Sequence, residues 1–309
     1  LGQFLTSGTY ANDGLRQLTA PEAAYVLPAV ADTLMACGRG YAAVLYKDLF
    51  PDLHPAVREL QQQGGYLLPV DPVMELKLDS SWNSLDDYLT TLTSKYRVRY
   101  RRARGKLTGL RRRRLSIADV ERYRETLYEL YRNTSSGADF NAAELSPAYF
   151  PWLVRVGAGQ PQLVATAHSL RGPLDIDPAY GKTYLHGYFN EANELVGFTS
   201  AIPNGSVLHA HYLGLRDEYK FSHHLYHNML FDLLESGITG KFNTLDYGRT
   251  ALEIKSSVGA RPVDYACLLQ ARNGLINRLI PIFTPAVYRA QEWQPRNPFK
   301  QGVSGKAKS

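Results

Sequence analysis

Four apolar segments follow one another after residue 160, each as long as a β-strand and bounded by turn residues. They cover residues 162–170, 183–189, 194–202 and 206–215. Asn190–Asn193 and Pro203–Gly205 separate the last three, and such short polar connections join antiparallel strands. A helix, a strand, a helix and a strand are expected next, at 217–237, 242–248, 250–259 and 262–270. This order predicts an α/β or α+β fold, with a mixed, mainly antiparallel sheet flanked by helices.

The first 135 residues alternate helical and strand patterns. Strands are expected at 41–46 and 73–78, and helices after Thr19, at 55–64 and at 118–134. Ser84 followed by Asp87 resembles a capping box that opens a further helix, which continues into a run of arginines. Gly105 and Gly109 indicate where that helix ends.

These patterns divide the chain into four parts. We expect an N-terminal α/β half at 1–82, a linking part at 83–135 that holds the basic helix and the helix after it, and a core domain at 136–294. The last part, 295–309, is rich in polar residues, glycine and lysine, and is expected to be disordered.

Composition places the protein among ordinary water-soluble domains, with 44% apolar and 21% charged residues. No apolar stretch reaches the roughly 18–20 residues that cross a bilayer, so no transmembrane span is expected. Cys37 and Cys267 lie among apolar residues, which indicates reduced thiols and a cytoplasmic protein.

The positive charge is concentrated between Lys95 and Arg114, where 11 cations occur without one acid. Because the net charge of the chain is +6, the rest of the chain is net negative. The run is interpreted as a solvated helix face, as a site for tRNA or another RNA, or as a contact with anionic lipid. The candidate polyanion-binding residues are Arg97, Arg101, Arg104, Arg111, Arg112, Arg113 and Arg114.

A second informative stretch is TLDYGRTALEIKSSVGARP, at residues 244–262. Gly248 permits a backbone conformation or a close approach that a side chain would block, and Thr250 with Glu253 forms a capping box for the next helix. Arg249 is then left to bind a phosphate or carboxylate, or to pair with Asp246 or Glu253. Lys255, one turn into the helix, adds a second cation.

The segments LDYGRTALEIKSSVGARPVDY and SLDDYLTTLTSKYRVRYRRARGKL resemble the FemAB-like N-acyltransferases of the GNAT superfamily. The resemblance implies a GNAT-like fold with a degenerate GNAT-like N-terminal half. It implies transfer of an acyl or aminoacyl group to a small-molecule or lipid-linked amine. The donor it implies is an acyl-CoA, an acyl carrier protein or an aminoacyl-tRNA, and no metal is expected.

The sequence departs from this superfamily where a glycine-containing loop normally binds the pyrophosphate of acetyl-CoA. Here Gly214 and Arg216 are present, but no glycine follows, and Asp217 and Glu218 would repel a diphosphate. Acetyl-CoA is therefore not the expected donor. A CoA-dependent enzyme with an atypical loop around Arg216 is the alternative.

Acyl transfer needs a base, a group that stabilises the oxyanion and an acid for the leaving group. The resemblance implies that the strands at 206–215 and 242–248 part to admit the donor. His209 and His211 point to one face of their strand, and the alternative is that both are core histidines beneath the long helix. The expected catalytic residues are His211 and Tyr212, near the amine, and Tyr247, near the leaving group. The expected substrate-binding residues are Arg249, Lys255, Glu253, Arg216 and Tyr219.

Two further readings of the sequence remain. His223 and His227 share a helical face, as metal ligands can, but no glutamate or cysteine accompanies them, and a helix surface is favoured. The alternative to an enzyme is a non-catalytic GNAT-like module that binds RNA or anionic lipid through residues 95–114.

Overall fold

The computed structural model describes residues 18–36, 42–49, 53–135, 144–157, 183–287 and 292–301. The strand expected at 162–170 and Cys37 lie outside these residues. The chain forms two compact units. Unit 1 comprises residues 1–74, 248–250 and 261–294, and unit 2 comprises 75–247, 251–260 and 295–309.

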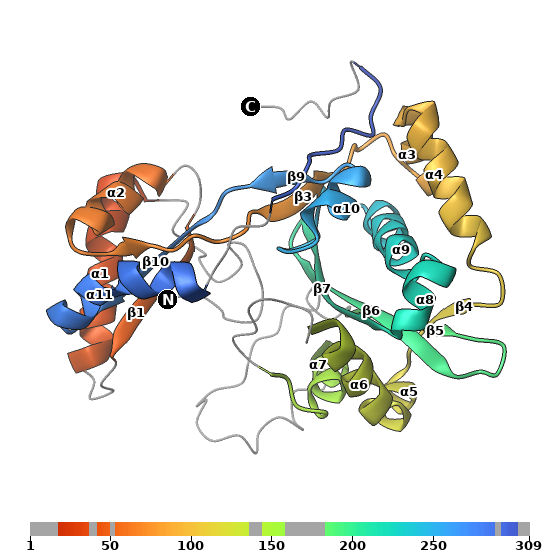
Figure 1. The fold of residues 1–309 in the computed structure, drawn as a ribbon, viewed down its shortest axis with the longest axis horizontal. Helices are drawn as coiled ribbons and strands as arrows, with labels where there is room; N and C mark the ends of the chain where they lie inside the picture. The colour runs from red at the N-terminus through yellow and green to blue at the C-terminus, as the bar shows by residue number, and fades with distance from the viewer. Residues whose placement is uncertain are drawn as a thin grey trace. The chain divides into compact units, whose positions relative to one another are not determined.

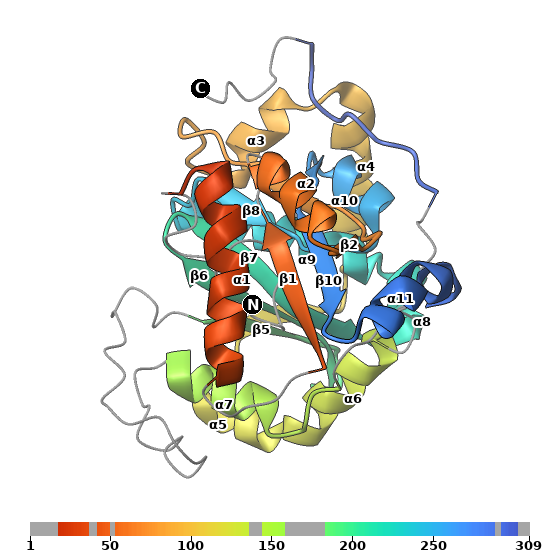
Figure 2. The same cartoon turned by 90° about the vertical axis from the view of Figure 1, so that its left-hand side faces the viewer.

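Unit 1 is built on a small antiparallel sheet with the order β1-β10-β2. The strands are β1 (Ala43–Leu49), β2 (Tyr66–Leu67) and β10 (Ala266–Ala271), and β1 lies beside β10 in Figure 2. The helices are α1 (Ala20–Ala36), α2 (His54–Gln62) and α11 (Gly274–Val287). Leu27, Tyr46, Leu60 and Leu268 bury their side chains in one cluster, which packs α1 and α2 on the sheet. The predicted N-terminal GNAT-like half stays a prediction.

The larger sheet has the order β4-β5-β6-β7-β8-β3-β9. Its strands are β3 (Val73–Lys77), β4 (Arg111–Arg114), β5 (Tyr184–Phe189), β6 (Leu195–Asn204), β7 (Val207–Leu215), β8 (Thr244–Asp246) and β9 (Arg261–Val263). Strands β4 to β7 pair antiparallel, β8 pairs parallel with β7, and β3 pairs antiparallel with β8. The mixed, mainly antiparallel sheet predicted from the sequence is confirmed.

Helices cover both faces of the sheet in unit 2 (Figure 1). One face carries α5 (Ile117–Arg122), α6 (Arg124–Ser135) and α7 (Tyr149–Gly157), and the other carries α8 (Asp217–Ser222) and α9 (Leu225–Thr239). Leu130 and Phe150 pack on Phe198 of β6 from the first side, and Leu225 and Met229 pack on Val196 from the second. The remaining helices are α3 (Leu85–Thr91), α4 (Ser94–Gly105) and α10 (Leu252–Ser257).

Three predicted elements are interrupted. The helix expected at 217–237 breaks between α8 and α9, where His224 has a left-handed backbone with φ 47°. The strand expected at 262–270 divides into β9 and β10, which belong to different sheets. The capping box of Ser84 and Asp87 is confirmed, but its helix ends at Thr91 because Leu92 is extended, with ψ 151°, and bridges to Phe299. Gly105 ends α4 as expected.

The segment 295–301 packs on unit 2, which corrects the expectation of disorder for this part of the tail. The Thr93 amide donates to the Pro298 carbonyl and the Lys300 amide donates to the Thr91 carbonyl, each at 2.9 Å. Phe299 lies against the rings of Trp82 and Tyr88. Burial of the Phe299 ring favours the packing of this otherwise polar segment on unit 2.

No helix in the described part of the chain combines the length and the hydropathy that crossing a bilayer requires.

Candidate active site

Strands β7 and β8 pair over only three positions before they separate. Val207, Leu208 and His209 face Thr244, Leu245 and Asp246, and β7 then continues to Leu215 without a further pairing to β8. Within the described residues, the second half of β7 therefore presents an edge on the side where β8 has ended. The parting of these strands is what the sequence led us to expect.

A bulge interrupts β7 just beyond the last of these pairs. On the β6 side, Thr199 faces Leu213 and Ala201 faces Ala210, so Ser200 alone opposes both His211 and Tyr212. The Ser200 hydroxyl accepts a hydrogen bond from the Tyr212 amide at 2.9 Å and donates one to the Tyr212 carbonyl at 2.8 Å. A buried side chain thus stabilises the bulge by bonding both backbone groups of Tyr212.

The bulge brings two consecutive side chains to one face of the sheet. In a regular strand, neighbouring side chains point to opposite faces. Here the rings of His211 and Tyr212 are in contact, with centroids 4.4 Å apart, and both lie against Tyr149 of α7. Tyr131 of α6 also packs on Tyr212, with ring centroids 5.3 Å apart. We call His211, Tyr212, Tyr149 and Tyr131 the bulge cluster.

His211 has one engaged ring nitrogen and one without a partner. Its Nε2 shares a hydrogen bond with the Tyr149 hydroxyl. Its Nδ1 is enclosed and has no hydrogen-bond partner among the described residues. Burial, reinforced by the neighbouring His209, lowers the pKa of His211 to about 3, so the imidazole is neutral around pH 7. A buried ring nitrogen without a partner is costly, which makes it a candidate ligand contact.

The two tyrosines of the bulge cluster nearest His211 keep their protons. Burial raises the pKa of Tyr212 to about 12, with a smaller contribution from Tyr131. Burial also raises the pKa of Tyr149, and Tyr212 adds to that effect. At neutral pH both hydroxyls can therefore donate hydrogen bonds.

His209 lies on the same face as His211, as predicted, with ring centroids 6.2 Å apart. Its Nδ1 is 2.9 Å from Oδ2 of Asp246, and both residues are buried. His209 pairs with Ile202 of β6. Ile202 packs against the hydrophobic core that lies between the sheet and α5–α7. Of the alternative that these are core histidines beneath the long helix, the burial holds for His209, but the helices that cover them are α5–α7 and not α9.

Three of the expected site residues, Tyr247, Lys255 and Glu253, follow β8 along the chain. Tyr247 is buried and donates its hydroxyl to the Leu230 carbonyl at 2.8 Å, so that hydroxyl is engaged in the core. Lys255 is buried in α10 rather than exposed at its surface. Glu253 pairs with Arg296 instead of capping α10.

The predicted capping box of α10 is wrong for a conformational reason. Ala251, not Thr250, is the N-cap residue, and no side chain caps the helix. Thr250 and Ala251 both have left-handed backbones, with φ 67° and 48°. The extended conformation that a capping threonine needs is therefore absent at this turn.

Arg249 belongs to unit 1 and is held there by acceptors. Its guanidinium pairs with the buried Asp48 and donates to the Asp71 carbonyl. The predicted pairing of Arg249 with Asp246 or Glu253 stays a prediction. Arg249 thus forms an ion pair within unit 1, and its predicted role in substrate binding stays a prediction.

Arg216 and Tyr219 lie where β7 passes into α8, near the turn that joins β5 to β6. Arg216 donates to Glu194 at 3.4 Å, and the Tyr219 hydroxyl accepts from the Asn190 amide group at 3.3 Å. Asp217 and Glu218 occupy the first turn of α8, as the sequence indicated. Two acids at this position disfavour a bound diphosphate.

The arginine run divides between α4 and β4, and acids from other elements neutralise part of it. Arg104 pairs with Asp232 of α9 at 2.6 Å, Arg112 with Glu235 at 3.3 Å, and Arg113 with both oxygens of Asp119 at 2.7 and 2.9 Å. These three acids lie outside residues 95–114, so the run, which holds no acid of its own, is neutralised in part by other elements. Of the others, Arg97 donates to the Leu92 carbonyl, Arg111 to Asn193 and Arg114 to the Thr183 carbonyl, while Arg101 is exposed.

Sequence reasoning missed Tyr149, Tyr131 and Ser200. Their segments read as ordinary helix and strand, and only the β6–β7 register shows that Ser200 faces a bulge. His223 and His227, the pair considered for metal, contact Tyr219 and Phe231 respectively. Across the described ranges, no group of three or more histidine, cysteine, aspartate or glutamate side chains is arranged to hold a metal ion.

Solved structures with the same fold extend over most of the chain. FemX shares 12% identity over 83% of this chain and 79% of its own, with a TM-score of 0.51. The C-terminal domain (DUF2156) of a putative lysylphosphatidylglycerol synthetase from Agrobacterium fabrum shares 8% identity over 86% and 78%, with a TM-score of 0.50. The chain therefore shares the fold of FemX and of this synthetase domain. No protein-family model and no curated protein matches the sequence.

Proposed function

We propose that this protein is an N-acyltransferase that moves an acyl or aminoacyl group from an activated ester or thioester to an amine. The observation that carries the proposal is the β7 bulge, which sets His211 and Tyr212 side by side where β7 has left β8. The fold shared with FemX and with the Agrobacterium fabrum domain supports it, since the name of the latter describes a lysyl group joined to a phospholipid.

In this proposal the amine nitrogen attacks the carbonyl carbon of the donor, a C–N bond forms, and the C–O or C–S bond to the leaving group breaks. The amine must lose one proton in the process. His211 accepts it at Nδ1, in the tautomer whose Nε2–H donates to the Tyr149 oxygen. The low pKa of His211 keeps this nitrogen unprotonated before the reaction and makes it a weak base, so it takes the proton from the cationic nitrogen that forms with the C–N bond and not from the free amine.

Tyr212 supplies a proton to the departing group, and the proton taken up by His211 then passes to the Tyr212 oxygen, so that both neighbouring side chains return to their starting protonation. A hydroxyl whose pKa is about 12 can protonate an alkoxide, whereas a thiolate, with a pKa of about 8.5, leaves without that help. Together with the two acids in the first turn of α8, this favours an oxygen ester such as an aminoacyl-tRNA over an acyl-CoA or acyl carrier protein. The acceptor is a small-molecule or lipid-linked amine.

The direct test incubates the purified chain with acyl-CoA, acylated carrier protein or aminoacyl-tRNA and a panel of amines, and detects amide products by mass spectrometry. His211→Ala lacks the proposed base, so its turnover should be about 10²–10⁴-fold lower than that of the unmodified protein. His54→Ala is the control, because His54 is exposed at the start of α2 in unit 1. Tyr212→Phe should impair transfer from an ester more than from a thioester.

The proposal fails if no donor yields an amide, or if His211→Ala turns over as fast as the unmodified protein. Urea unfolding of each variant shows that lost turnover does not reflect lost folding.

A further inference from the structure

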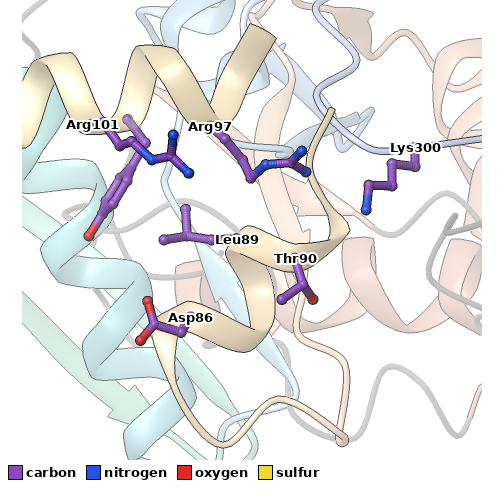
Figure 3. Close-up of a pocket in the computed structure, with 7 residues that line it drawn as sticks. Asp86, Leu89, Thr90, Arg97, Arg101 and Lys300 are labelled. Atoms are coloured by element: carbon purple, nitrogen blue, oxygen red, sulfur yellow. The ribbon is translucent and has the colours of Figure 1, made fainter. Parts of the chain in front are cut away.

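A pocket of about 550 Å³ lies between α3, α4 and the C-terminal segment of unit 2. Figure 3 shows two kinds of wall. Arg97 and Arg101 of α4 and Lys300 of the C-terminal segment line one side, and Asp86, Leu89 and Thr90 of α3 line the other. Three cations thus face a pocket wall that holds one acid.

The hydrogen bonds that position Arg97 and Lys300 involve groups other than acids. The Arg97 guanidinium donates to the Leu92 carbonyl, and to the Ser94 hydroxyl at 3.2 Å. Lys300 is fixed through its amide, which donates to the Thr91 carbonyl at 2.9 Å. No ion pair joins Arg97, Arg101 or Lys300 to a carboxylate among the described residues, so their charge is not neutralised within the pocket.

The facing wall limits what the pocket can accept. Thr90 donates its hydroxyl to the Asp87 carbonyl at 2.6 Å, so its oxygen remains as an acceptor. Asp86 would repel a second phosphate close to the first. A chain of phosphates, as in RNA, therefore fits this wall less well than one phosphate beside hydroxyl groups.

We propose that this pocket binds a single phosphate group carried by a small polyol, as a free compound or as a lipid headgroup. Guanidinium groups match phosphate oxygens bidentately, and a lysine adds a point charge. The site goes beyond the proposed acyl transfer and is separate from the bulge cluster. Tyr100 and Arg104 join α4 to Phe231 and Asp232 of α9, whereas the bulge cluster lies on the face that carries α5–α7.

Calorimetric titration of the full chain with glycerol 3-phosphate, inorganic phosphate and glycerol tests the pocket directly. Both phosphates should bind and glycerol should not. Arg101→Gln and Lys300→Gln should each weaken glycerol 3-phosphate binding at least tenfold. Arg102→Gln is the matched control, because Arg102 is the next residue on α4, is exposed and does not line the pocket. It should change the affinity less than twofold.

Asp86→Asn should strengthen the binding of inorganic phosphate, because it removes a repulsive charge from the same wall. The proposal is overturned if neither phosphate binds, or if Arg101→Gln and Arg102→Gln lose the same affinity, as expected for a diffuse attraction to polyanions such as RNA.

Vesicles identify the source of the phosphate. If the ligand is a lipid headgroup, phosphatidylglycerol vesicles should bind and phosphatidylcholine vesicles should not, with Lys300→Gln weaker and Arg102→Gln unchanged. If the ligand is a free compound, glycerol 3-phosphate should bind and neither kind of vesicle should. Lys300→Gln should then weaken the binding of glycerol 3-phosphate and Arg102→Gln should leave it unchanged. Vesicle binding that both variants reduce equally would contradict a role for the pocket.

Discussion

Three histidines of unit 2 are kept neutral by their surroundings, each mainly through burial. The pKa falls to about 4 in His186 and His227 and to about 3 in His211. Nearby cations add to the effect, Arg112 at His186 and Arg99 at His227. In the unfolded chain each imidazole returns to a pKa near 6.5, so the unfolded state binds more protons between these values.

The stability of the protein should therefore fall as the pH drops from 7 to 5. Each buried imidazole costs up to about 2 kcal/mol over this range, because the unfolded state takes up a proton that the folded state refuses. Urea titrations at pH 7 and pH 5 measure the loss. His227→Gln should reduce the loss of unfolding free energy between pH 7 and pH 5 by the contribution of one buried histidine. His54→Ala, at an exposed position, should leave that loss unchanged. An equal pH dependence in both variants would contradict the burial argument.

At the residue scale, strand alternation predicted that His209 and His211 share a face, and the structure confirms it. The addition of Tyr212 to that face could not be predicted, because it depends on the Ser200 side chain bonding both backbone groups of its neighbour. Tyr149 comes from a helix that no local motif connects to β7. The positions of Tyr212 and Tyr149 in the bulge cluster therefore depend on contacts between segments that are distant in the sequence.

At the element scale, β4 is attached to α9 through Arg112. The Arg112 guanidinium donates to the Ser236 hydroxyl at 3.1 Å and to Glu235 at 3.3 Å, and it lies near Asp232. Asp232 is buried, and it also accepts from Tyr188 at 2.6 Å and pairs with Arg104. Removing one cation leaves this acid less well compensated.

We expect Arg112→Gln to lower the free energy of unfolding by about 2 kcal/mol, less than the full cost of breaking a buried pair because Arg104 remains. Arg111→Gln is the matched control in the same strand. Arg111 is exposed and makes one long hydrogen bond to Asn193, so its loss should cost under about 0.5 kcal/mol. Urea unfolding of both variants measures the difference. Equal effects would show that β4 carries only surface charge.

Elements that are defined locally were predictable, and those that depend on distant partners were not. The capping box of α3 and the strands β5, β6 and β7 follow from side chains within each segment. The end of α3 does not, because Leu92 becomes extended in bridging to Phe299, far along the chain. The arginine run looked unneutralised for the same reason, since its acids come from α5 and α9.

At the scale of the whole molecule, the chain passes several times from one unit to the other. Residues 248–250 and 261–294 return to unit 1, while 251–260 and 295–309 belong to unit 2. The sequence placed one boundary near residue 82 and assigned 136–294 to a single core domain. Local patterns could not show that β10 pairs with β1, because both strands read as ordinary apolar segments.

The segment 295–301 belongs to unit 2, and Phe299 attaches it there. Its ring lies 6.4 Å from Trp82 and 6.1 Å from Tyr88, centroid to centroid. A Cβ on Gly259 would come within 2.5 Å of this ring, and Gly259 also has φ +96°. The glycine therefore leaves the space that Phe299 fills.

Phe299→Ala should lower the free energy of unfolding by about 2 kcal/mol, below the 3–5 kcal/mol of a fully buried phenylalanine because the ring is half-buried. Gln301→Ala, at an exposed position two residues on, should have little effect. Urea unfolding compares them. Because the same attachment holds the Lys300 backbone at Thr91, Phe299→Ala should also weaken phosphate binding in the α3–α4 pocket, which Gln301→Ala should preserve. Unchanged stability in Phe299→Ala would mean that the segment contributes nothing to unit 2.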